Sequence, residues 1–271
     1  MKKILIAAAV VIFSSSASVA APPSPVYGWT GFYAGVNVGG GWTDRTSVAN
    51  APNDAFAEFF FASQAVRPTG DSFKSSGVLG GVQLGYNYQF DRNWVAGLET
   101  DFQFADISGS GSTVLAPPAF VFSTASEQIK YFGTVRARLG YLPTEKLLIF
   151  ATGGFAYAQI NHSGGVTTGN NSAIFFTLGN QSILCGLGFP PGCFAGSQDR
   201  FTPGYTVGGG VEYALWQNWT VKGEYLFAQF KDTVTSVSAT APFAPVPTSY
   251  TANFTTNLNI VRIGLNYKFA N

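Results

Sequence analysis

Eight segments of this chain alternate apolar and polar residues with a period of two, and this repetition constrains the fold more than any other feature. Such alternation is typical of β-strands with one apolar and one polar face. In the last segment, Val261, Ile263 and Leu265 share one face, whereas Arg262 and Gly264 share the other. The eight predicted strands are residues 30–42, 78–90, 94–106, 129–141, 147–158, 204–215, 219–230 and 257–269.

The connections between these strands alternate between long and short. The long ones are residues 43–77, 107–128, 159–203 and 231–256, and the short ones are 91–93, 142–146 and 216–218. In an antiparallel barrel with an even number of strands, every long connection then lies at one rim and every short turn at the other. This asymmetry is typical of outer-membrane barrels, which have short periplasmic turns and longer external loops.

The two faces of the strands differ in size and polarity. The larger face carries Trp, Tyr, Phe, Leu and Val, and the smaller face carries Gly, Asn, Gln and charged residues. A soluble eight-stranded barrel of the lipocalin type points its apolar face inward. Because the interior of an eight-stranded barrel has little room, we expect the small, polar face inside and the apolar face in lipid. Only 11% of the residues are charged, against roughly a quarter in soluble proteins.

Aromatic residues gather near both ends of the predicted strands, as the two interfaces of a bilayer select. One band is Trp94, Trp219, Tyr141, Tyr213, Tyr267 and Phe269, and the other is Trp42, Phe102, Phe104, Tyr131 and Phe227. The sequence therefore predicts an all-β protein, an up-and-down, eight-stranded antiparallel transmembrane β-barrel. It has four long external loops and short periplasmic turns, and residues 29–269 form a single domain.

The N-terminus has the features of a secretory signal. Lys2 and Lys3 precede an apolar run, and Ser18-Val19-Ala20 forms a cleavage site of small residues. We expect residues 1–20 to be removed, residues 21–28 to be an extended lead-in, and the protein to reside in the outer membrane of a Gram-negative cell. Removing Lys2 and Lys3 from the 15 basic residues leaves 13 against 14 acidic ones. This near-neutral balance gives no electrostatic reason to bind nucleic acid.

Four acidic and four basic residues lie at similar heights on the polar faces. Because lone charges could not stay unpaired inside a barrel, we predict an internal salt-bridge network that plugs it. A catalytic constellation and a narrow, gated ion path are the alternatives. The predicted network is Glu99, Asp101, Arg136, Arg138, Glu212, Lys222, Glu224 and Arg262.

The connection 159–203 carries both cysteines and the single histidine. In an oxidising compartment we expect Cys185 and Cys193 to form a disulfide, since a metal site would need more ligands than two cysteines. His162 has no evident carboxylate partner in the sequence, and we expect a solvated loop residue. The sequence therefore predicts no catalytic residue, no metal site and no cofactor.

Three segments resemble a known family. They are W-T-G-F-Y-A-G-V-N-V-G-G-G-W at 29–42, A-T-G-G-F-A-Y at 151–157 and R-I-G-L-N-Y-K-F at 262–269. They are similar to the small, porin-like outer-membrane β-barrel proteins of rhizobia, Brucella and Bartonella, the 25/31-kDa outer-membrane protein and haemin-binding protein group. The resemblance covers the mature chain and implies an integral outer-membrane protein with surface-exposed loops and, in some members, haem binding.

The final strand also resembles the insertion signal that the outer-membrane assembly machinery reads. The matching residues are Arg262, Gly264, Tyr267 and Phe269, although Ala270 and Asn271 follow the aromatic end. The resemblance thus implies that machinery as a partner during insertion, together with outer-membrane lipid and lipopolysaccharide.

The expected function is structural: an envelope-stabilising barrel that exposes its loops. One alternative is a porin-like narrow channel for ions or small solutes. Another is surface binding of haem or a host ligand by the loops, for which residues 59–61 and 174–178 are candidates because they are apolar and aromatic. An enzyme is not expected. The sequence separates these hypotheses poorly, because the loops of a barrel carry functions of this kind.

Overall fold

The computed structural model describes residues 27–63, 72–116, 121–169, 173–178, 181–186, 192–239 and 248–269. The predicted signal segment and most of the lead-in lie outside these ranges. In the described part of the chain, no helix is both long and apolar enough to span a membrane.

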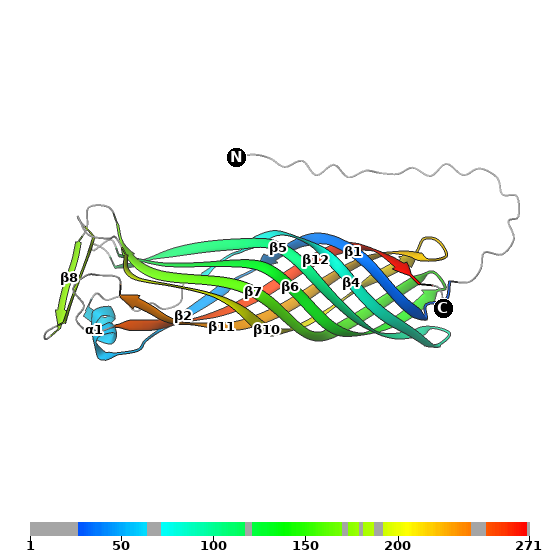
Figure 1. The fold of residues 1–271 in the computed structure, drawn as a ribbon, viewed down its shortest axis with the longest axis horizontal. Coiled ribbons are helices and arrows are strands. Elements are labelled where there is room, and N and C mark those ends of the chain that lie inside the picture. Colours follow the sequence, from blue (N-terminus) through cyan, green and yellow to red (C-terminus); the bar gives the residue numbers. More distant parts are fainter. Residues whose placement is uncertain are drawn as a thin grey trace, which may run out of the picture.

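Eight antiparallel strands form a closed ring among the described residues, which confirms the predicted fold class (Figure 1). Each strand pairs with its neighbours in the ring, and β1 pairs with β12 from Tyr33↔Lys268 to Thr43↔Leu258, so the ring has no free edge over the length of β1. In ring order the strands are β1 (Gly31–Thr43), β4 (Ser76–Asp91), β5 (Trp94–Ala116), β6 (Val121–Thr144), β7 (Leu147–Thr168), β10 (Gly192–Ala214), β11 (Trp219–Ala239) and β12 (Ser249–Lys268).

Shorter elements extend one end of the ring. β2 (Thr46–Pro52) follows β1 in the chain and pairs with the part of β12 that extends beyond β1. β2 also pairs with β3 (Ser72–Phe73). Helix α1 (Ala55–Ser63) follows β2, and β8 (Ala173–Leu178) pairs with β9 (Gln181–Gly186) in a separate hairpin. Figure 1 shows α1 and β8 at the same end, which we call the loop end; the opposite end, where the short turns lie, is the turn end.

The strands are much longer than the sequence pattern predicted. β6 and β7 contain 24 and 22 residues, and most of the predicted connection 107–128 is strand. Twenty-two residues span about 70 Å along a strand, or about 55 Å of height at a tilt of ~40°. A bilayer core is about 30 Å thick, so the barrel extends well beyond it.

The outward-facing residues change character part-way along the strands. Between the turn end and the level of Tyr131 on β6 they are exposed aliphatic and aromatic side chains, and we call this band the apolar belt. Just above it, Lys130 pairs with Asp199 at 2.9 Å, both 40% exposed, and Gln159 also bonds Asp199. Farther up, the outward positions of β5, β6, β7 and β10 are mostly small or polar, although Val114 on β5 is 56% exposed. They include one serine row, in which Ser110, Ser126, Ser163 and Ser197 lie opposite one another on successive strands.

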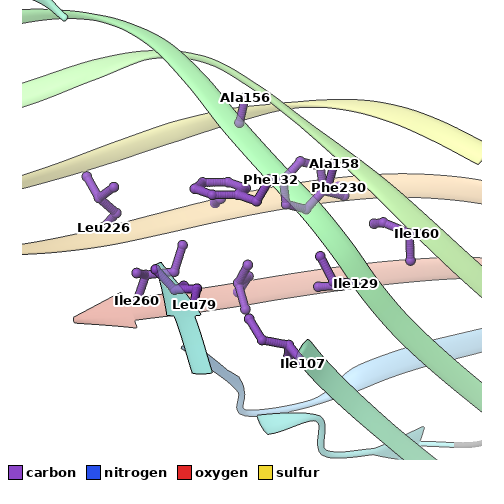
Figure 2. Close-up of a cluster of buried hydrophobic side chains, with 12 residues drawn as sticks. Leu79, Ile107, Ile129, Phe132, Ala156, Ala158, Ile160, Leu226, Phe230 and Ile260 are labelled. Carbon is purple, nitrogen blue, oxygen red and sulfur yellow. The ribbon is translucent and has the colours of Figure 1, made fainter. Parts of the chain in front are cut away.

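The interior is filled in layers. At the turn end, Trp29 packs with Val95, Leu142, Leu148 and Ala214. Farther along is a layer of charged side chains. Above that layer lies a second apolar cluster, shown in Figure 2. Its members are Leu79, Ile107, Ile129, Phe132, Ala156, Ala158, Ile160, Leu226, Ala228, Phe230, Leu258 and Ile260.

Candidate functional site: the charged layer inside the barrel

All eight predicted interior charges point into the lumen and are buried. Alternation along each strand turns them inward, and strand register brings opposite charges together. Glu99 on β5 lies directly opposite Arg136 on β6. Glu212↔Lys222 and Glu224↔Arg262 are likewise cross-strand partners. Oppositely charged cross-strand pairs stabilise a sheet, and here each pair also contributes to a larger network.

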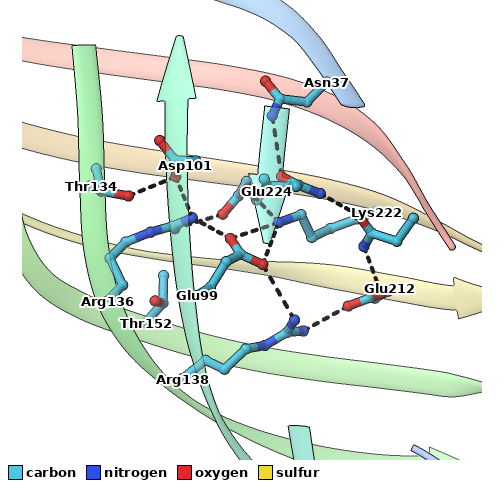
Figure 3. Close-up of polar contacts among 12 residues, drawn as sticks. Asn37, Glu99, Asp101, Thr134, Arg136, Arg138, Thr152, Glu212, Lys222 and Glu224 are labelled. Atoms are coloured by element: carbon cyan, nitrogen blue, oxygen red, sulfur yellow. Dashed lines mark hydrogen bonds and ion pairs between the residues drawn. The ribbon is translucent and has the colours of Figure 1, made fainter. Parts of the chain in front are cut away.

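Arg136 is the centre of this network (Figure 3). Its Nη1 donates to Glu224 Oε2 at 2.8 Å, and its Nη2 donates to Asp101 Oδ2 at 3.0 Å and to Glu99. Arg262 joins two of the same acids, with Nε 2.7 Å from Glu224 Oε1 and Nη2 2.8 Å from Asp101 Oδ2. Two guanidinium groups therefore bridge carboxylates from β5 and β11 across the lumen.

Lys222 links the two sides of the layer. Its Nζ lies 2.9 Å from both carboxylate oxygens of Glu99 and 3.0 Å from Glu224 Oε1. Because Glu99 and Glu224 also accept from Arg136, each carboxylate is held by more than one cation. Such multiple pairing is what allows charges to remain buried.

Arg138 completes the layer toward the turn end. Its Nη2 donates to Glu212 Oε2 at 2.8 Å, and its Nη1 donates to Tyr33 Oη at 3.0 Å. The guanidinium carbon also lies 4.2 Å from the centre of the Phe150 ring, a cation–π contact. Glu212 further accepts from Thr220 at 2.5 Å and from Asn266 at 2.9 Å.

Tyr33 is a member of the layer that the sequence analysis did not single out. Its hydroxyl donates to Glu99 Oε2 at 2.6 Å while accepting from Arg138, so it bridges the two ends of the network. Gly85 on the neighbouring strand makes room for it, because a Cβ there would lie 2.4 Å from the Tyr33 hydroxyl oxygen. A tyrosine on the polar face, beside a glycine, was the available signal.

The layer is electrically neutral, with four carboxylates facing four cations. Even so, several of its buried polar atoms have no hydrogen-bond partner within the described residues. These are Asn37 Oδ1, Asn87 Oδ1, Asp101 Oδ1, both amide atoms of Gln103, Arg136 Nε, Arg138 Nε and Arg262 Nη1. The charged groups of the layer thus pair with one another, but some of its polar atoms can still donate or accept a hydrogen bond.

The other predicted site residues lie elsewhere. Cys193 on β10 is buried and disulfide-bonded, and Cys185 lies in β9, where the side chains are outside the described part of the structure. Tyr267 and Phe269 face outward and contact each other edge to face, with ring centres 5.5 Å apart. Gly264 lies between them and Arg262 on β12.

The candidate loop contacts are only partly described. Phe59 on α1 is 49% exposed. Its helix is fixed at the N-terminus, where Asp54 Oδ1 accepts from the Ala57 amide at 2.8 Å. The side chains of residues 60, 61 and 174–178 lie outside the described part of the structure.

The expectation that His162 is a solvated loop residue is wrong. It lies inside β7 and is 1% exposed, with Glu127 and Asp232 as carboxylate partners. The error follows from the strand lengths, because residues 159–168 of that connection belong to β7, which pairs with β6 and β10. Both partners came from segments that the sequence pattern left as connections.

The outer membrane protein β-barrel domain family matches this chain over residues 5–269. The chain belongs to this family. It is also 32% identical over 250 residues to the 31 kDa outer-membrane immunogenic proteins of Brucella melitensis biotype 1 and Brucella suis biovar 1, covering 92% of this chain and 87% of each relative. The predicted resemblance to Brucella outer-membrane barrels is thereby confirmed. The protein is an outer-membrane β-barrel protein, and its loop end faces the outside of the cell.

Three solved outer-membrane proteins are similar to this chain at low sequence identity and low TM-score. The outer membrane protease OmpT of Escherichia coli is 12% identical, with a TM-score of 0.43, covering 88% of this chain and 97% of its own. OprG of Pseudomonas aeruginosa is 11% identical, with a TM-score of 0.40 and coverages of 89% and 97%. Ail of Yersinia pestis is 9% identical, with a TM-score of 0.30 and coverages of 86% and 99%. At these scores the similarities carry no argument about function.

Proposed function

We propose that this outer-membrane protein is a closed barrel that supports the envelope and exposes its loop end, without an open channel. The observation that carries the proposal is the charged layer, in which Arg136 joins carboxylates from opposite sides of the lumen. An ion entering the lumen would have to displace bonds among buried charges that pair with one another, and leaving one of them unpaired is costly.

Apolar packing supports the closed state on both sides of the charged layer. Trp29 lies in the turn-end mouth, where its Nε1 donates to the Glu145 carbonyl at 3.0 Å. Above the layer, Phe132 and Phe230 meet edge to face with ring centres 6.2 Å apart. Both side chains are almost completely buried. Hydrated ions would have to cross these apolar layers as well.

Conductance of the refolded protein in planar lipid bilayers tests the proposal. We expect no steady single-channel current from the wild type. Arg136→Ala and Glu99→Ala each open part of the layer, and Lys130→Ala, which removes an exposed pair, is the matched control. Steady currents from the wild type would contradict a closed barrel, and currents from Arg136→Ala alone would identify the layer as the closing element.

A narrow ion path is the second candidate. The unpartnered polar atoms of Gln103, Asn37 and Asp101 favour it, because groups that lack protein partners are available to water or an ion. In that case the wild type would conduct weakly, and Gln103→Leu would abolish the current.

The geometry does not favour haem binding through His162. Both ring nitrogens already contact carboxylates, and the side chain is buried, so ligation of iron would break two interactions. Haem titration of the wild type tests this directly, because a Soret shift that His162→Gln removes would contradict it. Enzymatic activity is not part of the proposed function, because the charged groups of the layer pair with one another.

A further inference from the structure

A second buried polar cluster lies near the loop end, above the apolar cluster of Figure 2. His162 on β7 is its centre. Its Nδ1 lies 3.2 Å from Asp232 Oδ2 on β11, and its Nε2 lies 3.1 Å from Glu127 Oε2 on β6. One imidazole thereby bridges two carboxylates on opposite sides of the ring.

This geometry favours a protonated ring when both carboxylates are ionised. A neutral imidazole carries a single N–H, so one of its nitrogens could only direct a lone pair at a carboxylate oxygen. An imidazolium donates from both nitrogens. Phe254 on β12 supports the cation, because it stacks on His162 with ring centres 4.2 Å apart and an angle of 27° between the planes.

Glu127 extends the cluster to three further parts of the barrel. Its Oε1 accepts from Ser75, just before β4, at 3.1 Å and from Thr46 on β2 at 3.4 Å. Its other oxygen accepts from Thr256 on β12. The carboxylate that binds His162 therefore also binds β2, the segment just before β4, and β12.

Asp232 connects the cluster to β10. Thr202 donates to its Oδ2 at 3.4 Å, and Arg200 Nη1 lies 3.8 Å from its Oδ1. Arg200 is largely exposed, so its charge is screened by solvent. Glu127, Asp232 and Arg200 are the charged groups that the described strands bring to this cluster.

We propose that His162, Glu127 and Asp232 form a proton-dependent clasp that holds the loop half of the barrel together. With the proton present, the imidazolium ties β6 to β11 through β7. When the proton leaves, one of the two nitrogen–carboxylate contacts becomes repulsive and the loop half loosens, while the charged layer within the apolar belt keeps the lumen closed.

The direction of the pH effect follows from the surroundings of the histidine. Burial alone lowers the pKa of His162, but the hydrogen bonds that the ring donates to Asp232 and Glu127, and the charges of both, raise that pKa overall. A raised folded-state pKa gives stability that is full below the unfolded value of about 6.5 and is lost as pH rises through the folded value. His162 lies beyond the Lys130–Asp199 pair, so the external medium sets its protonation. The clasp is closed at acidic pH and opens under alkaline conditions.

Nitrogen NMR tests the protonation directly, because the sequence holds one histidine. Untagged protein labelled with [15N]histidine is refolded in detergent micelles and titrated. We expect both ring nitrogens to be protonated at pH 6 and the titration midpoint to lie above that of free histidine. Asp232→Asn and Glu127→Gln should each lower the midpoint. A His162 that is neutral at pH 6 would overturn the proposal.

Hydrogen exchange tests the mechanical consequence. Peptides from residues 121–130 and 159–168 are compared between wild type and His162→Gln, with residues 131–141 in the apolar belt as internal reference. At pH 6 we expect about tenfold faster exchange in the variant, and at pH 9 equal exchange. Equal exchange in the wild type and the variant at pH 6 would overturn the proposed clasp. If His162→Gln does not fold, hydrogen exchange is compared between the wild type and Asp232→Asn, and the same outcomes support or overturn the clasp. Neither readout depends on whether the barrel conducts.

Discussion

Arg136 and Glu224 meet across the lumen at 2.8 Å, although β6 and β11 are three steps apart in the ring. Their contact is possible because an eight-stranded barrel is narrow enough for long side chains to reach its far wall. The other partners of both residues lie on β5, β11 and β12, so the pair links β5 and β6 to β11 and β12.

Removing the guanidinium of Arg136 should destabilise the barrel strongly. Glu99, Asp101 and Glu224 each lose a buried partner, and breaking such a network costs about 3–5 kcal/mol. Urea unfolding of the refolded protein in detergent, followed by tryptophan fluorescence, measures the change. Lys130→Ala should cost less than about 1 kcal/mol, because its partner Asp199 is exposed. Equal losses in the two variants would show that the layer contributes little.

The fit between Gly85 and Tyr33 gives a second prediction. Gly85→Ala forces the Tyr33 ring out of its position and should cost about 1–3 kcal/mol. In a Tyr33→Ser background the added methyl group meets no ring, so the same substitution should cost clearly less. The free energies of unfolding of the wild type, the two single variants and the double variant give the coupling energy between the two positions. Additive losses would mean that the two residues do not compete for space.

The boundary of the apolar belt can be tested on one strand. Val135→Arg places a charge on the lipid-facing side of β6 and should cost about 2–4 kcal/mol in lipid vesicles. Gln128→Arg, seven residues farther toward the loop end, should be nearly neutral because that position is outside the bilayer. A large penalty at residue 128 would place the membrane higher on the barrel.

The disulfide is open to a chemical test. If Cys193 is bonded to Cys185, as the sequence predicts, an alkylating reagent should label the unfolded protein only after reduction. Mass spectrometry of tryptic peptides then identifies the bonded pair. Labelling of both thiols without reduction would contradict the prediction.

The end of β12 should govern insertion. Phe269→Ala removes the exposed aromatic residue of the predicted insertion signal and should slow assembly. The fraction of heat-modifiable protein in outer-membrane preparations measures this. Phe201→Ala, which removes an exposed aromatic residue from β10, is the control. Equal assembly of both variants and the wild type would remove Phe269 from the signal.

The sequence predicted the part of the fold that lies within lipid. There, outward positions such as Val135 and Leu139 must be apolar and inward positions such as Arg136 must be small or polar, so alternation marks each strand. Beyond the belt, water replaces lipid and both faces of a strand accept polar residues. Ser126 faces outward and Glu127 faces inward, yet both are polar. The alternation that marks a strand is therefore absent there, and the sequence predicts connections where the structure has the upper halves of the strands.

Period-two alternation within lipid depends only on local geometry, and it is therefore enough to predict the eight ring strands, their antiparallel order and the inward placement of eight charges. Which charges meet across the lumen, how Tyr33 enters the layer, and how Glu127 and Asp232 hold His162 become visible only in the folded barrel. These contacts join residues distant in the chain, and they depend on the stagger of the strands around the ring, which no local pattern specifies.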